Sequence, residues 1–201
     1  MGFLSVLSYA HKLVLERLDA HSGYAIDATA GTGVDTLLLA KAAGKRGQVF
    51  SFDIQQDALD RTQERLDKED PYKLAVVKLI LDSHASMKKY IPEAWHGKIQ
   101  VIMFNLGYLP AGDLSIITEP DSTLTALQSA FDLLTVRGIL TIVLYPGHAG
   151  GAEEAALVQV WASSLPVEAA QSIIYRQLQR QDSPYLIAIE KKKMNADSQS
   201  S

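Results

Sequence analysis

Short apolar segments alternate with longer amphipathic segments along most of this chain, and this alternation is the feature that most constrains the fold. The short segments are mostly apolar on both faces, as is typical of buried parallel strands. They cover residues 24–28, 48–52, 74–81, 99–104 and 139–144. Helical patterns, with apolar residues three and four positions apart, cover residues 34–43, 55–68 and 122–134. Strands that alternate with helices of this length predict a doubly wound α/β sheet.

The last third of the chain departs from this pattern. After an expected helix at residues 151–164, two strand-like segments at 168–178 and 184–191 are separated by a polar loop too short for a crossover helix. They are predicted to form an antiparallel hairpin. A mostly parallel sheet of seven strands that ends in such a hairpin resembles the class I S-adenosylmethionine-dependent methyltransferase fold, which is Rossmann-like. We expect one domain over residues 1–193, with an N-terminal helix, and a disordered tail at 194–201.

The composition excludes several classes of chemistry. The chain has no cysteine, so it has no disulfides, no thiolate metal sites and no cysteine nucleophile, and we expect no metal. Methylation of a pyrimidine C5 through thiolate attack is excluded with them. The net charge of −4 means that a polyanionic partner would be held by a local patch. The apolar stretch at residues 3–14 is interrupted by polar residues, which predicts neither a signal peptide nor a membrane span and favours a cytoplasmic protein.

A glycine-rich turn, Asp-Ala-Thr-Ala-Gly-Thr-Gly-Val-Asp-Thr at residues 27–36, directly follows the first expected strand. Such a turn lets a ligand approach bare backbone at a helix N-terminus, although a turn without a ligand has the same pattern. Asp53 ends the second strand, 20 residues after Gly33, where a carboxylate either accepts both hydroxyls of a ribose or caps the next helix. A dinucleotide fingerprint has glycine or alanine where this chain has Thr36, and Asp35 would oppose a pyrophosphate. The turn therefore favours adenosylmethionine over a dinucleotide.

The third strand is followed by Ser83 and His84. In methyltransferase folds this turn lies against the adenine ring, so either side chain is a candidate to bind its edge. The alternative is a cap for a helix at residues 85–90.

The fourth strand runs into Asn105-Leu106-Gly107-Tyr108. This motif resembles the Asn/Asp-Pro-Pro-Tyr signature of methyltransferases that act on amine or amide nitrogens, with Leu-Gly in place of Pro-Pro. In that signature the asparagine oxygen accepts a hydrogen bond from the substrate nitrogen, and the aromatic ring supports the substrate. The alternative is that Asn105 caps a turn and Tyr108 packs on the surface. The loop from 106 to 120 has no periodic pattern and is long enough to predict a substrate loop or lid.

A second glycine-rich strand end carries Tyr145 and His148. Tyr145 is a candidate wall of the pocket, and His148 is a candidate to orient the substrate or bind a phosphate, unless the segment is only a turn into the next helix. The expected catalytic set is Asn105, Tyr108, Tyr145 and His148. The expected cofactor-binding set is Asp27, Thr29, Gly31, Gly33, Asp35, Thr36, Asp53, Gln55, Ser83, His84 and Asn105.

Taken together, these motifs resemble one bacterial family, the rRNA methylase family that has been associated with MnmM-type transfer RNA methyltransferases. The resemblance also includes Gln181-Asp182-Ser183-Pro184 and Ile187-Ala188-Ile189-Glu190, and it covers nearly the whole chain. It implies N-methylation of 5-aminomethyl-(2-thio)uridine at the wobble position of the tRNA anticodon stem-loop. It also implies a homodimer.

Five cationic or titratable side chains are candidates for RNA contact, although each is more often a solvated surface group: His11, Lys88, Lys89, Arg176 and Arg180. Three alternatives stay open on the sequence alone. The nearest is a methyltransferase of the same fold that acts on ribosomal RNA or a small amine. The others are an NAD(P)-dependent oxidoreductase and a non-enzymatic nucleotide-binding module.

Overall fold

The structure is a computed structural model that describes residues 2–107, 120–147, 150–180 and 182–193. The strands are β1 (Tyr24–Asp27), β2 (Gln48–Asp53), β3 (Val76–Leu81), β4 (Ile99–Leu106), β5 (Leu134–Leu144), β6 (Ala170–Tyr175) and β7 (Tyr185–Lys191). The α-helices are α1 (Val6–Leu15), α2 (Val34–Ala42), α3 (Gln56–Leu66), α4 (Pro120–Leu133) and α5 (Gly151–Ser164). The short 3-10 helices are η1 (Pro71–Lys73), η2 (His84–Lys89) and η3 (Glu93–Trp95).

All seven strands form one sheet in the order β3-β2-β1-β4-β5-β7-β6. The first five strands are parallel, whereas β7 runs antiparallel to both β5 and β6. The predicted doubly wound sheet with a terminal antiparallel hairpin is therefore confirmed. The expected single-domain boundary and disordered tail stay predictions, and residues 194–201 lie outside the described residues.

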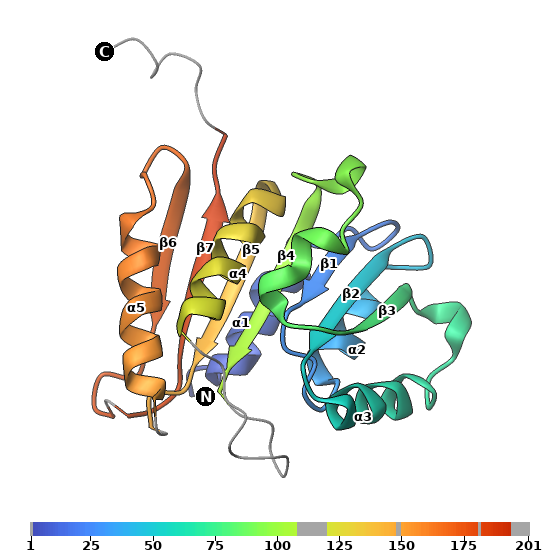
Figure 1. The fold of residues 1–201 in the computed structure, drawn as a ribbon, viewed down its shortest axis with the longest axis horizontal. Coiled ribbons are helices and arrows are strands. Elements are labelled where there is room, and N and C mark those ends of the chain that lie inside the picture. Colours follow the sequence, from blue (N-terminus) through green and yellow to red (C-terminus); the bar gives the residue numbers. More distant parts are fainter. Residues whose placement is uncertain (1, 108–119, 148–149, 181, 194–201) are drawn as a thin grey trace.

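Helices cover both faces of the sheet (Figure 1). One face packs against α4, α5 and η2 through a core that includes Phe52, Phe104 and Leu127. The other face packs against α1 and α2 through residues such as Val14, Leu39 and Met103. Because strand side chains alternate between faces, the neighbours Met103 and Phe104 belong to different cores.

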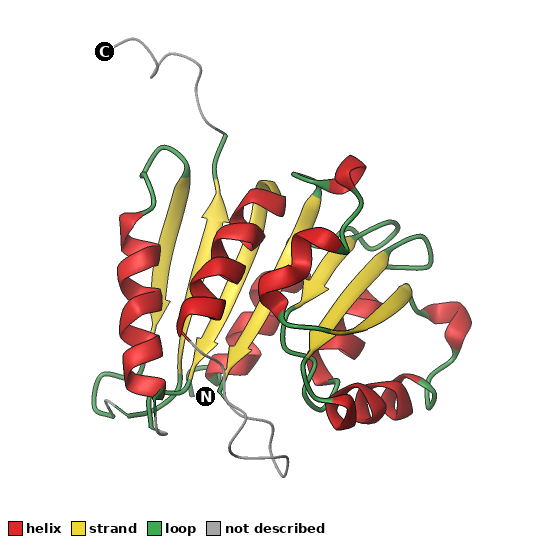
Figure 2. Ribbon diagram, viewed as in Figure 1, coloured by secondary structure: helices red, strands yellow, loops and turns green. Residues whose placement is uncertain are grey.

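The connection from β3 to β4 contains only short helical turns (Figure 2). The helix at residues 85–90, which the sequence offered as the alternative interpretation of this turn, corresponds to the 3-10 helix η2 at His84–Lys89. None of the helices in the described part of the chain is long and apolar enough to cross a membrane.

Strand β5 begins five residues earlier than the pattern predicts. Leu134 already pairs with Ile99, and a register irregularity follows before Val101 pairs with Ile139. Arg137 has a φ of 66°, the left-handed region that costs energy for a side chain with a Cβ. Gly138 in this segment is typical of a turn in the sequence. Pairing with β4 on both sides of the irregularity nevertheless keeps the segment in the strand.

Candidate active site

The carboxyl ends of β1, β2, β4 and β5 lie at one edge of the sheet, and most of the predicted site residues gather there. The Ala28 amide donates to the Met103 carbonyl over 2.9 Å, and the Ala30 amide donates to the Phe52 carbonyl over 2.8 Å. These contacts fasten the glycine-rich turn to the two strands beside β1. The turn, the end of β2 and the end of β4 thus share one location, as expected for the ligand edge of an open α/β sheet.

The carboxyl group of Asp27 lies beneath this turn and is fully buried. Its Oδ2 accepts from the Thr36 hydroxyl at 2.6 Å, and its Oδ1 accepts from the Thr29 amide at 3.1 Å. Burial and the neighbouring charge of Asp35 raise the pKa of Asp27 to about 7, against the opposing effect of these hydrogen bonds. Because the Asp27 and Thr36 side chains are both fully buried, we interpret them as supports that hold the turn rather than as direct ligands of a cofactor.

Two glycines give the turn its shape. Gly31 and Gly33 have φ values of 55° and 76°. A Cβ on Gly33 would also lie 2.8 Å from the Cα of Thr62 in α3, so the glycine lets α3 approach the turn. The Arg65 side chain, also on α3, donates to the Thr32 carbonyl at 2.7 Å. This clamp was not predicted, because no local pattern connects two residues so far apart in the sequence.

The half-buried carboxylate of Asp53 links the turn to the next helix. Its Oδ2 accepts from the Gly31 amide at 3.0 Å, and its Oδ1 accepts from the Gln55 amide at 2.9 Å. The contact with the Gln55 amide is the helix-capping contact that the alternative interpretation of Asp53 predicted. The side chain of Gln55 makes no capping hydrogen bond. Asp53 keeps part of its surface exposed at the strand end, where a ligand could reach it. Binding of ribose hydroxyls by Asp53 stays a prediction.

A chain of hydrogen bonds joins three elements beside the turn. Asp35, in the first turn of α2, accepts from the Asn105 side-chain amide through Oδ2, and its Oδ1 lies 2.6 Å from His11 Nε2 of α1. The Asn105 backbone amide donates to the Thr29 hydroxyl at 2.7 Å. Asn105 Oδ1 is buried and has no hydrogen-bond partner among the described residues. The site therefore contains one acceptor whose partner the described part of the protein does not supply.

Tyr145 follows β5 at the same edge and is partly buried. Burial and the negative charge of Asp35 raise the pKa of its hydroxyl, so Tyr145 stays protonated at neutral pH. Tyr108, His148 and most of the expected substrate loop lie outside the described residues. The predicted contribution of those residues stays a prediction.

After β3, Ser83 caps η2 and His84 is its first residue. Ser83 accepts from the Ala85 amide at 3.2 Å, which is the cap that the sequence offered as the alternative. His84 is buried against Phe104, and its Nδ1 donates to the Ala28 carbonyl at 3.2 Å. Burial lowers the pKa of His84, so the ring is neutral. Its Nε2 has no partner among the described residues, and contact with an adenine edge stays a prediction for both residues.

The predicted RNA-contacting cations are placed differently from one another. Lys88 forms an ion pair with Asp132 of α4, and Lys89 donates to the Ser86 hydroxyl at 3.4 Å. Arg176 lies over the Tyr185 ring, 5.2 Å from its centroid. Because Tyr175 pairs with Leu186 and Tyr185 pairs with Leu144, Arg176 lies at the same sheet edge as Tyr145. The exposed Arg180 follows in the same connection.

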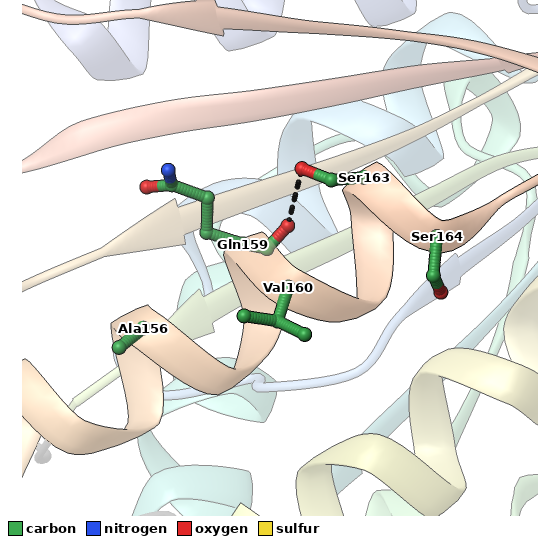
Figure 3. A pocket seen from close by; sticks show the side chains of 5 residues that line it. All are labelled: Ala156, Gln159, Val160, Ser163 and Ser164. Atoms are coloured by element: carbon green, nitrogen blue, oxygen red, sulfur yellow. Dashed lines mark hydrogen bonds between the residues drawn. The ribbon is translucent and has the colours of Figure 1, made fainter.

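The outer face of α5 carries a shallow open depression that does not resemble a catalytic site (Figure 3). Both of its serines are satisfied by the helix itself: Ser163 donates to the Gln159 carbonyl at 2.8 Å, and Ser164 donates to the Trp161 carbonyl at 2.7 Å. In the described ranges, no cluster of three or more histidine, aspartate or glutamate side chains is arranged to hold a metal ion.

The charge at the sheet edge fits a cationic ligand. Asp35 and Asp53 flank the turn, and a third carboxyl group, Asp27, lies beneath it. Carboxylates at these positions oppose a pyrophosphate, whereas they suit a ligand with ribose hydroxyls, an ammonium and a sulfonium. The residues present therefore fit adenosylmethionine better than a dinucleotide.

Comparison with known proteins identifies the family. The model of the family described as "Putative rRNA methylase" matches residues 49–190. The chain belongs to this family. It is 37% identical over 186 residues to the chloroplastic tRNA (mnm5s2U34)-methyltransferase of Arabidopsis thaliana, with 90% of this chain and 67% of that protein covered.

Similar solved structures agree with this assignment. The chain is similar to a "putative rRNA-methylase" from Clostridium thermocellum, with 35% identity, a TM-score of 0.87, and 95% and 100% of the two chains covered. It is also similar to a "putative methyltransferase" from Streptococcus mutans in complex with SAH, with 33% identity, a TM-score of 0.81, and 94% and 99% covered. These findings confirm the class I methyltransferase fold and S-adenosylmethionine-dependent methyl transfer for this member of the family. The contact residues predicted above stay predictions.

Proposed function

We propose that the chain methylates the amine of 5-aminomethyl-(2-thio)uridine at wobble position 34 of transfer RNA. The activity named for the Arabidopsis relative supports the substrate class, because that relative matches 90% of this chain. The residues at the end of β4 support a nitrogen as the methyl acceptor. The alternative acceptors within the same fold are ribosomal RNA and a small amine.

The proposal rests on the side-chain oxygen of Asn105, Oδ1. It is a buried acceptor with no partner among the described residues, and leaving such an atom unpaired is costly. A neutral primary amine has two N–H donors and one lone pair. Donation of one N–H to Asn105 Oδ1 leaves the lone pair free to point at the methyl group, which is the alignment that a displacement reaction needs.

The cofactor supplies a methyl group on a positively charged sulfur. Asn105 holds the amine in position, and Tyr145 lines the same edge with a protonated hydroxyl. The nitrogen becomes positively charged as its lone pair forms the new bond to the methyl carbon, while the bond from that carbon to sulfur would break and leave its electron pair on the sulfur of the departing S-adenosylhomocysteine. The carboxylate of Asp35, one hydrogen bond away from Asn105, stabilises this charge until the extra proton leaves to water.

The RNA is held by a limited number of cations in this proposal. Arg176 and Arg180 lie at or near the sheet edge that carries Asn105, and an anticodon loop presents unpaired bases that enter a pocket at low cost. Charge reversal at both arginines is expected to raise KM for tRNA and leave kcat nearly unchanged. His11, Lys88 and Lys89 contact Asp35, Asp132 and Ser86 and stay candidates for RNA contact.

The experiment that tests the substrate is nucleoside mass spectrometry of transfer RNA from cells that lack this protein. Accumulation of the 5-aminomethyl base, and its conversion by purified protein with adenosylmethionine, is the expected result. Methyl incorporation only into ribosomal RNA would contradict the proposal. In the same assay Asn105→Ala is expected to abolish most of the transfer, whereas Gln171→Ala, an exposed change on β6, leaves it intact.

The homodimer that the family resemblance implies is also a proposal, and light scattering coupled to gel filtration tests it. The cytoplasmic location expected from the sequence stays a prediction that fractionation of cells would test.

A further inference from the structure

We propose that His11 and Asp35 are positioning residues that fix the orientation of the Asn105 side-chain amide, so that its oxygen and not its nitrogen faces the substrate amine. This inference rests on the proposed function, because it assigns the atom that receives the amine. It concerns residues that neither touch the reacting atoms nor follow from the sequence motif around Asn105.

Three separate elements contribute to the arrangement. Asp35 extends from the first turn of α2, and its side chain is only 7% exposed. One carboxylate oxygen accepts from Asn105 Nδ2, and the other lies 2.6 Å from Nε2 of His11 in α1, whose side chain is 23% exposed. The Asn105 backbone is held independently by the Thr29 hydroxyl. The side-chain amide is thus the part of Asn105 whose orientation depends on Asp35.

An amide group has two ends of similar shape and opposite hydrogen-bonding character. Rotation of the Asn105 side chain by half a turn would exchange Oδ1 for Nδ2 and present donors to the substrate's own N–H groups. An ionised carboxylate only accepts hydrogen bonds, so Asp35 selects the orientation in which Nδ2 faces it. The oxygen must then face the other way, where the described residues provide no donor.

His11 completes the arrangement by holding Asp35. A single hydrogen bond from Asn105 would leave the buried carboxylate free to rotate and poorly compensated, and such a group is costly to bury. Asp35 raises the pKa of His11 through their hydrogen bond, so the ring is a good donor near neutral pH. The charge of Asp35 also raises the pKa of two other groups at the site, Asp27 and Tyr145.

The positioning role and an RNA-contact role for His11 predict different kinetics. If His11 bound RNA, its loss would raise KM for tRNA. If it positions Asn105 through Asp35, its loss lowers kcat and leaves KM for tRNA and the affinity for S-adenosylhomocysteine nearly unchanged, since misalignment of the amine slows the chemical step.

The first test measures steady-state kinetics of His11→Leu, His11→Gln and His21→Leu on undermodified tRNA. We expect His11→Leu to lower kcat by about 10-fold or more, which is the scale of a lost aligning contact. We expect His11→Gln to restore most of the activity, because its side-chain nitrogen can donate to Asp35. His21 is the matched control: it lies 3.6 Å from Asp19 but is 92% exposed and belongs to no predicted site contact, so its replacement leaves kcat unchanged.

Asp35→Asn alone and combined with His11→Leu shows whether the two residues act together. The double variant is expected to lose no more activity than the more damaged single variant, because both changes break the same arrangement. Additive losses, or a His11→Leu effect confined to KM, would overturn the positioning role. Wild-type protein that methylates no tRNA would contradict the proposed function instead.

A second test needs no substrate and therefore separates the two failures. The pKa of His11 is followed by NMR in the wild type, in Asp35→Asn and in Asn105→Ala. Asp35→Asn is expected to lower the His11 pKa. Asn105→Ala is expected to raise it, because the Asp35 carboxylate then loses the hydrogen bond from Asn105 and stabilises the protonated His11 ring more strongly. A His11 pKa that does not respond to Asn105→Ala would overturn the coupling whatever the enzyme methylates.

Discussion

The Thr36 hydroxyl lies 2.6 Å from Asp27 Oδ2 and donates a hydrogen bond to this fully buried carboxyl group. The same hydroxyl accepts from the Ser51 hydroxyl at 2.7 Å. These hydrogen bonds join helix α2 to the end of β1 and to β2. Thr36 stands at the position where a dinucleotide-binding turn has a glycine or an alanine. Thr36, which favours adenosylmethionine over a dinucleotide, therefore also has a structural role: its hydroxyl links α2 to β1 and β2.

Thr36→Val is expected to lower the free energy of unfolding by about 1–3 kcal/mol, the cost of leaving buried polar partners unsatisfied. Urea unfolding measures the change. The matched control is Thr141→Val, because the buried Thr141 hydroxyl has no partner in the described ranges, so its loss is expected to be neutral or stabilising. Equal losses from both variants would contradict the role assigned to Thr36.

Asp27 is expected to make the protein less stable as the pH rises from about 4 to about 7. The folded state keeps a proton up to its pKa of about 7, whereas the unfolded chain releases it near 3.8, so the unfolding free energy falls by up to about 1.4 kcal/mol per pH unit. Asp27→Asn should flatten this dependence in urea unfolding measured at several pH values. A pH dependence that is the same in Asp27→Asn as in the wild type would contradict this role of Asp27.

Gly33→Ala is expected to be more destabilising than Gly97→Ala. Both glycines have positive φ values, 76° and 73°, so each alanine carries a similar backbone strain of about 1 kcal/mol. Only at Gly33 would the new Cβ lie 2.8 Å from the Thr62 backbone, whereas nothing lies within 4 Å at Gly97. Thermal unfolding of the two variants measures the difference, and equal shifts would show that α3 moves away without cost.

Asp53→Asn is expected to weaken S-adenosylhomocysteine binding by about 10- to 100-fold, since hydrogen bonds to a charged group contribute about 1.5–3 kcal/mol. Titration calorimetry measures the affinity. The control is Asp57→Asn, because Asp57 lies nearby in the first turn of α3 but pairs with Arg61 at 2.6 Å on the surface. Unchanged affinity in Asp53→Asn would remove Asp53 from the predicted cofactor site.

Much of the fold followed from local patterns. The parallel strands at Tyr24–Asp27, Gln48–Asp53 and Ile99–Leu106 coincide closely with the apolar segments, because burial on both faces leaves a continuous apolar signal. The short polar connection at 179–183 was sufficient to predict the antiparallel hairpin of β6 and β7. The start of β5 was missed, because its first residues depend on pairing with β4 rather than on their own pattern.

The site divides in the same way. The sequence by itself determined that a glycine turn, Asp53 and Asn105 lie at the ends of the first, second and fourth buried strands, and parallel strands must bring such ends to one edge. Only the tertiary structure decided which side chains face one another there. His11 and Asp35 are 24 residues apart, and Asp35 and Asn105 are 70 apart, so no local spacing encodes their contact. Packing of α1 and α2 against the same face of the sheet brings them together, which is why the sequence placed His11 among the RNA contacts and the structure places it beside Asp35.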